Sequence, residues 1–381
     1  MRFLRACMVA GCVCVAFALA GCAATTSSGH VRTYYIAADE VNWNYCPMGV
    51  NEMMGKPFDA YERTFTQRTP HRIGCIYRKA IYREYTDGTF RTLKPRPPDQ
   101  QYLGILGPII HAEVGDTIKV VFRNNASRPY SMHPHGVLYD HASEGVAYND
   151  GVPGSGGEVL PGHTYTYTWY VPERAGPGPN DPSSIVWLYH SHVDDQRDVD
   201  SGLVGAIVVT RKGMANPDGT PRDVDREIVA LFETFDENQS WYLDYNIAHD
   251  APAVDKTERS LEIPIDTDNR YSLVGTAFAD SNTKYTINGY LYANGPKMVM
   301  RKGQRVRWYL LTIGNGINFH TPHWHGNTVL WDGMRTDVIA LSPAQMITVD
   351  MVPDNPGIWL FHCHVADHMR AGMSALYQVL P

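Results

Sequence analysis

The run from His362 to Met373 carries most of the ligands of a copper site on one loop. Cys363 offers a thiolate, His368 an imidazole five residues later, and Met373 a thioether ten residues after the cysteine. A thiolate, two imidazoles and a weak axial thioether are the donors of a trigonal mononuclear copper site. The loop therefore predicts such a site, and its second imidazole must come from elsewhere in the chain.

Three further histidine clusters precede this loop and bring the motif histidines to ten of the sixteen in the chain. They are His133 with His135, His190 with His192, and His320 with His323 and His325. Side chains alternate along a β-strand, so each His-x-His pair directs both imidazoles to one face. Four pairs exceed the needs of one zinc ion, and calcium and magnesium prefer oxygen ligands. A single pair is more often an ordinary core or surface feature, but four pairs and the loop favour several copper ions.

The four clusters resemble the four copper-binding motifs of the multicopper oxidases. Other segments are similar to the A-type domains of ceruloplasmin and hephaestin, namely residues 34–38, 103–110, 189–192 and 236–243. The resemblance covers nearly all of the mature chain. It implies four copper ions per chain, of which one is type 1, one is type 2 and two are type 3.

The resemblance also implies which side chains hold each ion. The type 1 site would take three equatorial ligands and an axial thioether, which are His320, Cys363, His368 and Met373. The type 2 ion would be held by His133 and His323. The type 3 pair would be held by His135, His190 and His364 on one ion and by His192, His325 and His362 on the other. An axial Met is typical of a moderate reduction potential.

An internal repeat divides the chain into two similar halves. In each half a β-branched run leads to a His-x-His-Gly cluster, and a Trp-containing run leads to a second His-x-His pair. Short runs of period two between Gly, Pro, Asn and Asp clusters are typical of Greek-key β-sandwiches. We therefore predict an all-β protein with domains at 31–213 and 222–381, and the resemblance makes both domains cupredoxin-like.

The first half lacks the mononuclear copper ligands of the second. Aligning the halves places Tyr130, Ser191, Gln196 and Ser201 where the second half has His320, Cys363, His368 and Met373. Without the thiolate, no type 1 site is possible in the first half.

The N-terminus resembles a bacterial lipoprotein signal. Basic residues precede an apolar run that is short for a membrane span, and residues 1–21 end just before Cys22. Cleavage and acylation of Cys22 would leave residues 22–30 as a tether and would anchor an exported protein to the cell envelope, facing the periplasm or the exterior. A plain cleaved secretory signal is the alternative.

Composition narrows the partners and the thiol chemistry. The chain is 44% hydrophobic and 19% charged, which is ordinary for globular domains, and its formal net charge of −7 argues against nucleic acid as a partner. Cys46 and Cys75 remain once the signal, Cys22 and Cys363 are assigned. An exported protein favours a disulfide between them, and two free buried thiols are the alternative.

The resemblance implies O2 as the electron acceptor and Fe(II) as the reducing substrate. Asp280 and Asp367 are candidate iron-binding residues, but Tyr285 stands where the ferroxidase domains have an iron-binding His. A laccase-like oxidase of phenols, or an oxidase of Cu(I), would use the same copper ions. A non-enzymatic copper-binding module of the cell envelope is the alternative outside the enzymes.

Reduction of O2 consumes protons, and two carboxylates are candidate donors. Asp150 lies where the resemblance places a proton-supplying carboxylate, although an Asp before Gly151 also favours a turn, and Glu144 is the second candidate. The trinuclear ligands come from both domain types. By analogy with two-domain relatives, we therefore expect the trinuclear site to form between the subunits of a homotrimer.

Overall fold

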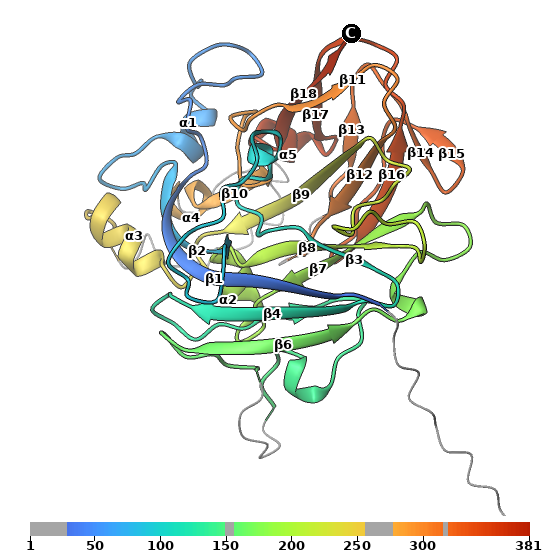
Figure 1. Cartoon of the computed structure of the whole chain (residues 1–381). Helices are drawn as coiled ribbons and strands as arrows, with labels where there is room; N and C mark the ends of the chain where they lie inside the picture. The colour runs from blue at the N-terminus through green and yellow to red at the C-terminus, as the bar shows by residue number, and fades with distance from the viewer. Residues whose placement is uncertain (1–28, 149–155, 256–276, 315–318) are drawn as a thin grey trace, which may run out of the picture.

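The computed structural model describes residues 29–148, 156–255, 277–314 and 319–381. Within these ranges the chain folds into four β-sheets, so the all-β class predicted from the sequence is confirmed. Figure 1 shows the sheets of the first half below and those of the second half above and to the right. Residues 1–28, which include the expected signal and Cys22, lie outside the described residues, as does Asp150.

Two four-stranded sheets form the first half. In spatial order, the strands of one sheet are β2 (Ile76–Tyr85), β1 (Val31–Asn44), β4 (Thr117–Asn124) and β6 (Thr164–Tyr170). The strands of the other are β3 (Ile110–Glu113), β8 (Val204–Thr210), β7 (Ser184–His190) and β5 (His133–Pro134).

The second half repeats this arrangement and adds a hairpin. The strands of its larger sheet are β10 (Thr283–Ile287), β9 (Arg226–Asp236), β12 (Val306–Leu311), β16 (Met346–Met351), β14 (Val329–Trp331) and β15 (Met334–Thr336). The strands of its other sheet are β11 (Met298–Arg301), β18 (Ser374–Leu380), β17 (Gly357–Cys363) and β13 (Pro322–Trp324).

Strand pairing shows that the two halves share one topology. β1 runs parallel to β4 as β9 runs parallel to β12, and β3 runs parallel to β8 as β11 runs parallel to β18. In the first half His133 pairs with His190, and in the second His323 pairs with His362. The repeated register therefore sets equivalent histidines side by side in both halves.

The described helices are all short and lie in the connections. The α-helices are α1 (Glu62–Thr66), α2 (Asp195–Asp200), α3 (Leu243–Asp250), α4 (Ala277–Ser281) and α5 (Ala366–Arg370). The 3-10 turns are η1 (Pro98–Leu103), η2 (His141–Ser143) and η3 (Glu173–Ala175). Among the described residues, no helix is long and apolar enough to span a bilayer.

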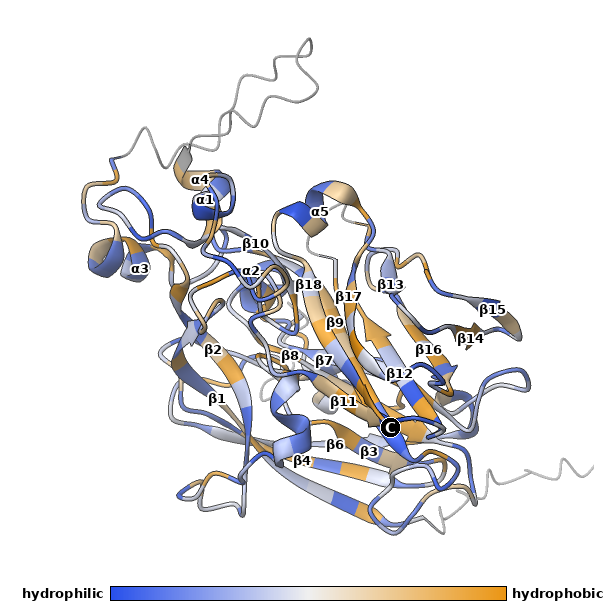
Figure 2. Ribbon diagram, turned by 90° about the horizontal axis from the view of Figure 1, so that it is seen from above, coloured by the Kyte–Doolittle hydropathy of each residue, from blue (hydrophilic) through white to orange (hydrophobic). Residues whose placement is uncertain are grey.

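One hydrophobic core crosses the seam between the halves. It joins Leu106 and Val186 of the first half to Trp308 and Tyr309 of the second. β8 and β12 are buried along their whole length, because both of their faces are covered, whereas β4 alternates between buried and more exposed positions. Figure 2 shows the corresponding run of hydrophobic residues along β9 and β17.

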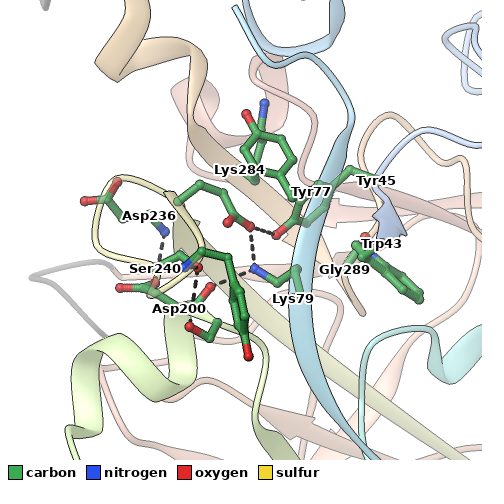
Figure 3. Close-up of polar contacts among 12 residues, drawn as sticks. Trp43, Tyr45, Tyr77, Lys79, Asp200, Asp236, Ser240, Lys284 and Gly289 are labelled. Carbon is green, nitrogen blue, oxygen red and sulfur yellow. Dashed lines mark hydrogen bonds and ion pairs between the residues drawn. The ribbon is translucent and has the colours of Figure 1, made fainter. Parts of the chain in front are cut away.

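The seam also contains a buried ion pair. Lys79 of the first half pairs with Glu237 of the second, and both side chains are 0% exposed. Lys79 Nζ donates to the Asp200 carbonyl oxygen at 2.7 Å, and the Tyr45 hydroxyl donates to Glu237 (Figure 3). These bonds satisfy one oxygen of the Glu237 carboxylate and join the two halves at this point, whereas the other carboxylate oxygen is buried without a hydrogen-bond partner among the described residues.

Replacing Lys79 alone should destabilise the seam, because the Glu237 carboxylate would stay buried without its counter-ion. We expect Lys79→Met to lower the free energy of unfolding by about 3–5 kcal/mol. Lys79→Met with Glu237→Leu should cost less, because both charges are gone. Chemical unfolding of the two variants at equal copper content measures this, and an equal loss in both would contradict it.

Candidate metal centres

The type 1 ligands predicted from the sequence come together at one end of the second sandwich. Cys363 ends β17, His368 lies on α5, and His320 forms a bridge with Leu341. The sulfur of Cys363 lies 4.0 Å from Nδ1 of His320 and 3.7 Å from Nδ1 of His368. Three ligands around one ion stand about 3.5–4 Å apart when the bonds are about 2.0–2.3 Å long. The donor set and its spacing therefore fit a trigonal copper ion.

Two backbone contacts organise this site around the sulfur. The amide of Thr321 donates to the Cys363 sulfur at 3.3 Å, and the Cys363 amide donates to the Met373 carbonyl oxygen at 3.1 Å. Met373 is fully buried in the same hydrophobic cluster as Cys363. The structure thus brings the expected axial residue to the site. The bond from the Thr321 amide to the sulfur could not be predicted from the sequence, because every residue type except proline carries a backbone amide.

The equivalent place in the first half holds a hydrogen-bond network. The hydroxyl of Ser191, which stands where Cys363 would, accepts from the Ser131 amide at 3.0 Å and donates to Asp198 at 2.6 Å. Asp198 also accepts from Trp241 Nε1 at 2.9 Å. Burial raises the pKa of Asp198 to about 6. In the alignment of the halves, Asp198 stands opposite Arg370, each seven residues after Ser191 or Cys363. The alignment therefore shows an acidic residue near the position of the missing thiolate.

The eight remaining motif histidines form two groups of four. In the first half, the His133 ring lies 5.4, 5.5 and 5.2 Å from the rings of His135, His190 and His192. In the second, the His323 ring lies 4.7, 5.0 and 5.1 Å from the rings of His325, His362 and His364. In each group three histidines have ligand atoms within 4.8 Å of one another, as a shared metal ion requires, namely His133, His135 and His190, and His323, His325 and His362.

The two groups do not meet within the chain. Among the described histidines, each ring contact joins rings of the same half, and no set of three ligand atoms within 4.8 Å combines the halves. His364 is exposed, and the His323 side chain is 19% exposed. Each group by itself therefore offers a smaller ligand set than the combined one expected from the sequence.

Backbone carbonyls orient one imidazole in each half in the same way. Nδ1 of His190 bonds the Ser191 carbonyl oxygen at 3.0 Å, and Nδ1 of His362 bonds the Cys363 carbonyl oxygen at 2.8 Å. Both rings then present Nε2 to a neighbouring imidazole, His135 or His325, at 3.1 Å. Such outer bonds fix the tautomer of a metal-binding imidazole.

A glycine lets two of the four His-x-His clusters pass over a tryptophan. Gly136 and Gly326 both have φ of +76° and follow the two clusters directly. A Cβ would lie 2.2 Å from the Trp187 ring at Gly136 and 2.4 Å from the Trp359 ring at Gly326. Any larger residue would therefore push the preceding imidazoles out of place.

Burial keeps several ligands neutral. Desolvation lowers the pKa of His320 to about 3 and those of His135 and His362 to about 4, with neighbouring imidazoles adding to the effect. Desolvation also lowers the pKa of His368 and raises that of the Cys363 thiol, which the Thr321 amide opposes. Neutral imidazoles have a free lone pair for a metal, whereas the thiol must first lose its proton.

The residues expected to bind the reducing substrate lie near the type 1 ligands. The ring of Tyr285 packs 5.0 Å from the ring of His368, and Asp367 precedes that histidine. Burial, with smaller contributions from Tyr61, Asp280 and Asp367, raises the pKa of Tyr285 to about 12. Both carboxylates also raise the pKa of Tyr61, a first-half residue that the sequence analysis missed. Nothing in the sequence links Tyr61 to a loop about three hundred residues later.

The remaining candidates are placed as follows. Nδ1 of His133 bonds the Glu144 carbonyl oxygen at 2.7 Å, and the Glu144 carboxylate accepts from the Tyr148 hydroxyl at 2.9 Å. Asp150 lies outside the described residues. Cys46 and Cys75 form a disulfide with Cα atoms 5.8 Å apart, which decides between the two alternatives left by the sequence.

Comparison with family models and solved structures agrees with this geometry. Residues 101–213 and 263–381 match two family models, both described as multicopper oxidase, which together cover more than half of the chain. Among solved structures, a blue copper oxidase from Nitrosomonas europaea is 18% identical with a TM-score of 0.54, covering 92% of this chain and 86% of that one. A copper nitrite reductase from the same organism is 17% identical with a TM-score of 0.54, covering 92% and 94%. These likenesses support the cupredoxin-like fold.

The similar curated proteins are much longer than this chain. Human Ferroxidase HEPHL1 is 45% identical over 91% of the chain and 29% of that protein. Mouse Hephaestin is 43% identical over 92% of the chain and 29% of that protein. Human Ceruloplasmin is 39% identical over 92% of the chain and 31% of that protein. The chain thus spans less than a third of the relatives it matches.

Copper uptake at the type 1 ligands should release about one proton per ion. The imidazoles of His320 and His368 are already neutral, so the proton comes from the Cys363 thiol. We expect the logarithm of the copper affinity to rise by about one per pH unit between roughly pH 5 and 8. Titration of the copper-free protein, followed by the visible band of the copper–thiolate bond, measures this slope. A slope near two or three would mean that the imidazoles are protonated and would contradict the prediction.

Proposed function

The chain belongs to the multicopper oxidase family, and on this premise we propose that it oxidises a metal ion such as Fe(II) and transfers the electrons to O2, forming water. The observation that carries the proposal is the cluster of His320, Cys363 and His368 near two carboxylates, with two further imidazole groups in the same chain. When bound, copper would accept electrons one at a time and deliver four of them to O2.

Cys363 connects the two kinds of site through the chain itself. Its sulfur faces His320 and His368, while its backbone is bonded directly to His362 and His364. Alternation along β17 sends the His362 imidazole away from the sulfur, and the His364 ring, just after the strand, lies 5.7 Å from the His362 ring. A covalent path of only a few bonds therefore runs from the thiolate to imidazoles of the trinuclear group.

The carboxylates favour a cationic donor. Asp280 and Asp367 both raise the pKa of the Tyr61 and Tyr285 hydroxyls, so the two carboxylates lie in one region. Tyr285 packs on His368, which places this region near that histidine. Carboxylate oxygens suit hard divalent cations, and His368 bridges the short distance from that region to the Cys363 sulfur. The resemblance to a protein named as a ferroxidase supports the same donor.

We also propose that the trinuclear site is completed by a neighbouring copy of the chain in a homotrimer. The support is the division of eight imidazoles into two groups that do not contact each other among the described residues. A closed ring lets the first half of each subunit face the second half of the next. Each imidazole group of one subunit would then face the complementary group of a neighbouring subunit.

Two further parts of the proposal rest on the sequence pattern. Glu144 is proposed as a proton source because it lies next to His133, which it bonds through its backbone. Acylation of Cys22 is proposed to hold the exported protein at the envelope, and acyl chains on the mature N-terminal peptide, found by mass spectrometry, would test it.

The donor assignment is tested by removing both carboxylates. We expect Asp280→Asn with Asp367→Asn to lower kcat/KM for Fe(II) by tenfold or more, equivalent to about 1.4 kcal/mol, because the cation loses its charged ligands. Oxidation of a neutral phenol should change little. Steady-state O2 consumption with each donor measures both.

The matched control removes two acids from surface ion pairs. Asp99→Asn with Asp225→Asn changes the net charge equally but acts on the pairs with Arg226 and Arg305. It should leave Fe(II) turnover intact. Equal losses with both donors, or no loss with Fe(II), would count against a metal ion as substrate.

The shared site is tested by mixing two defective chains. His135→Ala removes a ligand of the first group and His325→Ala one of the second, while both leave the type 1 ligands in place. If sites form between subunits, co-expression should restore O2 reduction to about a quarter of wild type, because random assortment brings two intact halves together at that frequency. If each chain builds its own site, the mixture will be as inactive as either variant, although the type 1 band persists.

A further inference from the structure

A loop of the first half leaves its own domain and lies against the second. We call residues 47–74 the disulfide loop, because the Cys46–Cys75 bond closes it. Its first part is held by backbone contacts. The Met48 amide donates to Asn294 Oδ1 at 2.9 Å, the Glu52 amide to the Tyr292 carbonyl oxygen at 3.1 Å, and Asn294 Nδ2 to the Val50 carbonyl oxygen at 2.8 Å.

A buried lysine of the second half holds the rest of the disulfide loop. Lys284 is 0% exposed, and its Nζ donates to the carbonyl oxygens of Phe65 at 2.6 Å and Gly74 at 2.9 Å. The third bond goes to the Ser281 carbonyl oxygen at the end of α4, at 2.5 Å. α1 of the loop therefore lies beside α4, as Figure 2 shows. Tyr285, the next residue of the chain, is the one that packs on His368.

Aromatic rings continue outward from His368 into the loop. Phe65 meets Tyr285 edge to face at 6.2 Å, and Tyr61 meets Phe65 edge to face at 5.5 Å. The guanidinium of Arg370, two residues after His368, lies 4.3 Å from the centre of the Tyr61 ring. Tyr285, whose ring packs on His368, is thus backed on its outer side by residues of the disulfide loop.

The disulfide has a mechanical reason to be there. A cavity of about 500 Å3 is lined mostly by the disulfide loop itself, including Phe58, Ile73 and the two cysteines that close it, and outside the loop by Asn44, Ile76 and Asp250. Packing is incomplete beside this cavity, so the covalent bond limits how far the loop moves.

We propose that the disulfide loop forms the outer wall of the donor site and restricts that site to small cations. This inference rests on the proposed function, because it assigns the selectivity of the same site. A planar donor would have to displace Tyr285 or Phe65 to reach the edge of His368. A metal ion needs only the carboxylates of Asp280 and Asp367 at the rim.

The test loosens the loop in two independent ways. Tyr61→Ala removes the contact with Arg370 and keeps the disulfide, whereas Cys46→Ser with Cys75→Ser opens the loop and keeps its aromatic residues. The control is Phe90→Ala, which removes a comparable ring from another connection of the first half, where it packs on Tyr35 and Tyr85.

Two readouts are expected to change together. In the copper-loaded protein, the ratio of kcat/KM for a bulky phenol to that for Fe(II) should rise about tenfold in both loop variants and stay unchanged in the control. In the copper-free protein, iodoacetamide should alkylate Cys363, the free cysteine of the described residues, several times faster, as peptide mapping would show.

The outcomes separate the two proposals. Unchanged donor ratios and unchanged alkylation in Tyr61→Ala, which retains the disulfide and so the fold, would overturn the role of the loop. Absence of Fe(II) turnover in the wild type would instead overturn the proposed function, and the alkylation rates would still decide whether the loop covers the site.

Discussion

The two-residue period of β17 is the constraint on which the rest depends. It sends the side chain of Cys363 into the hydrophobic core and that of His362 to the opposite face, and His364, which follows the end of the strand, places its ring 5.7 Å from that of His362. A helix would have distributed the same three residues around its axis, and a loop would not have fixed them. One strand end thereby contributes to two candidate metal-binding clusters, and the pairing of β13 with β17 brings His323 next to His362.

The same geometry occurs in the first half with a different outcome. β5 and β7 set His133 opposite His190, as β13 and β17 do for their histidines. The ligands facing outward are retained, whereas the inward position holds Ser191 bonded to Asp198. Duplication of one sandwich therefore explains both the symmetry of the imidazoles and the single thiolate, and the shared core and the Lys79–Glu237 pair hold the two copies in one arrangement.

Much of this could be predicted from the sequence because it depends on local periodicity. Alternation and turn residues indicated the β-sandwiches, and the spacing of Cys363, His368 and Met373 indicated the mononuclear site. What escaped depends on contacts between distant segments. Tyr61 and Phe65 reach the type 1 histidine from the other half of the chain, and the separation of the two imidazole groups follows from how the halves pack. The bond between Cys46 and Cys75 was predictable only as one of two alternatives, since spacing along the chain does not measure distance in space.

The network around Asp198 has a consequence for the order in which the molecule matures. The Asp198 carboxylate accepts hydrogen bonds from Ser191, Trp241 and two backbone amides. The position equivalent to the Cys363 site is therefore filled by side chains of the protein itself. The first half therefore needs no mononuclear ion at this position to complete its packing. It can reach its final packing before any ion occupies the Cys363 site, and it then offers a finished surface against which the second half packs.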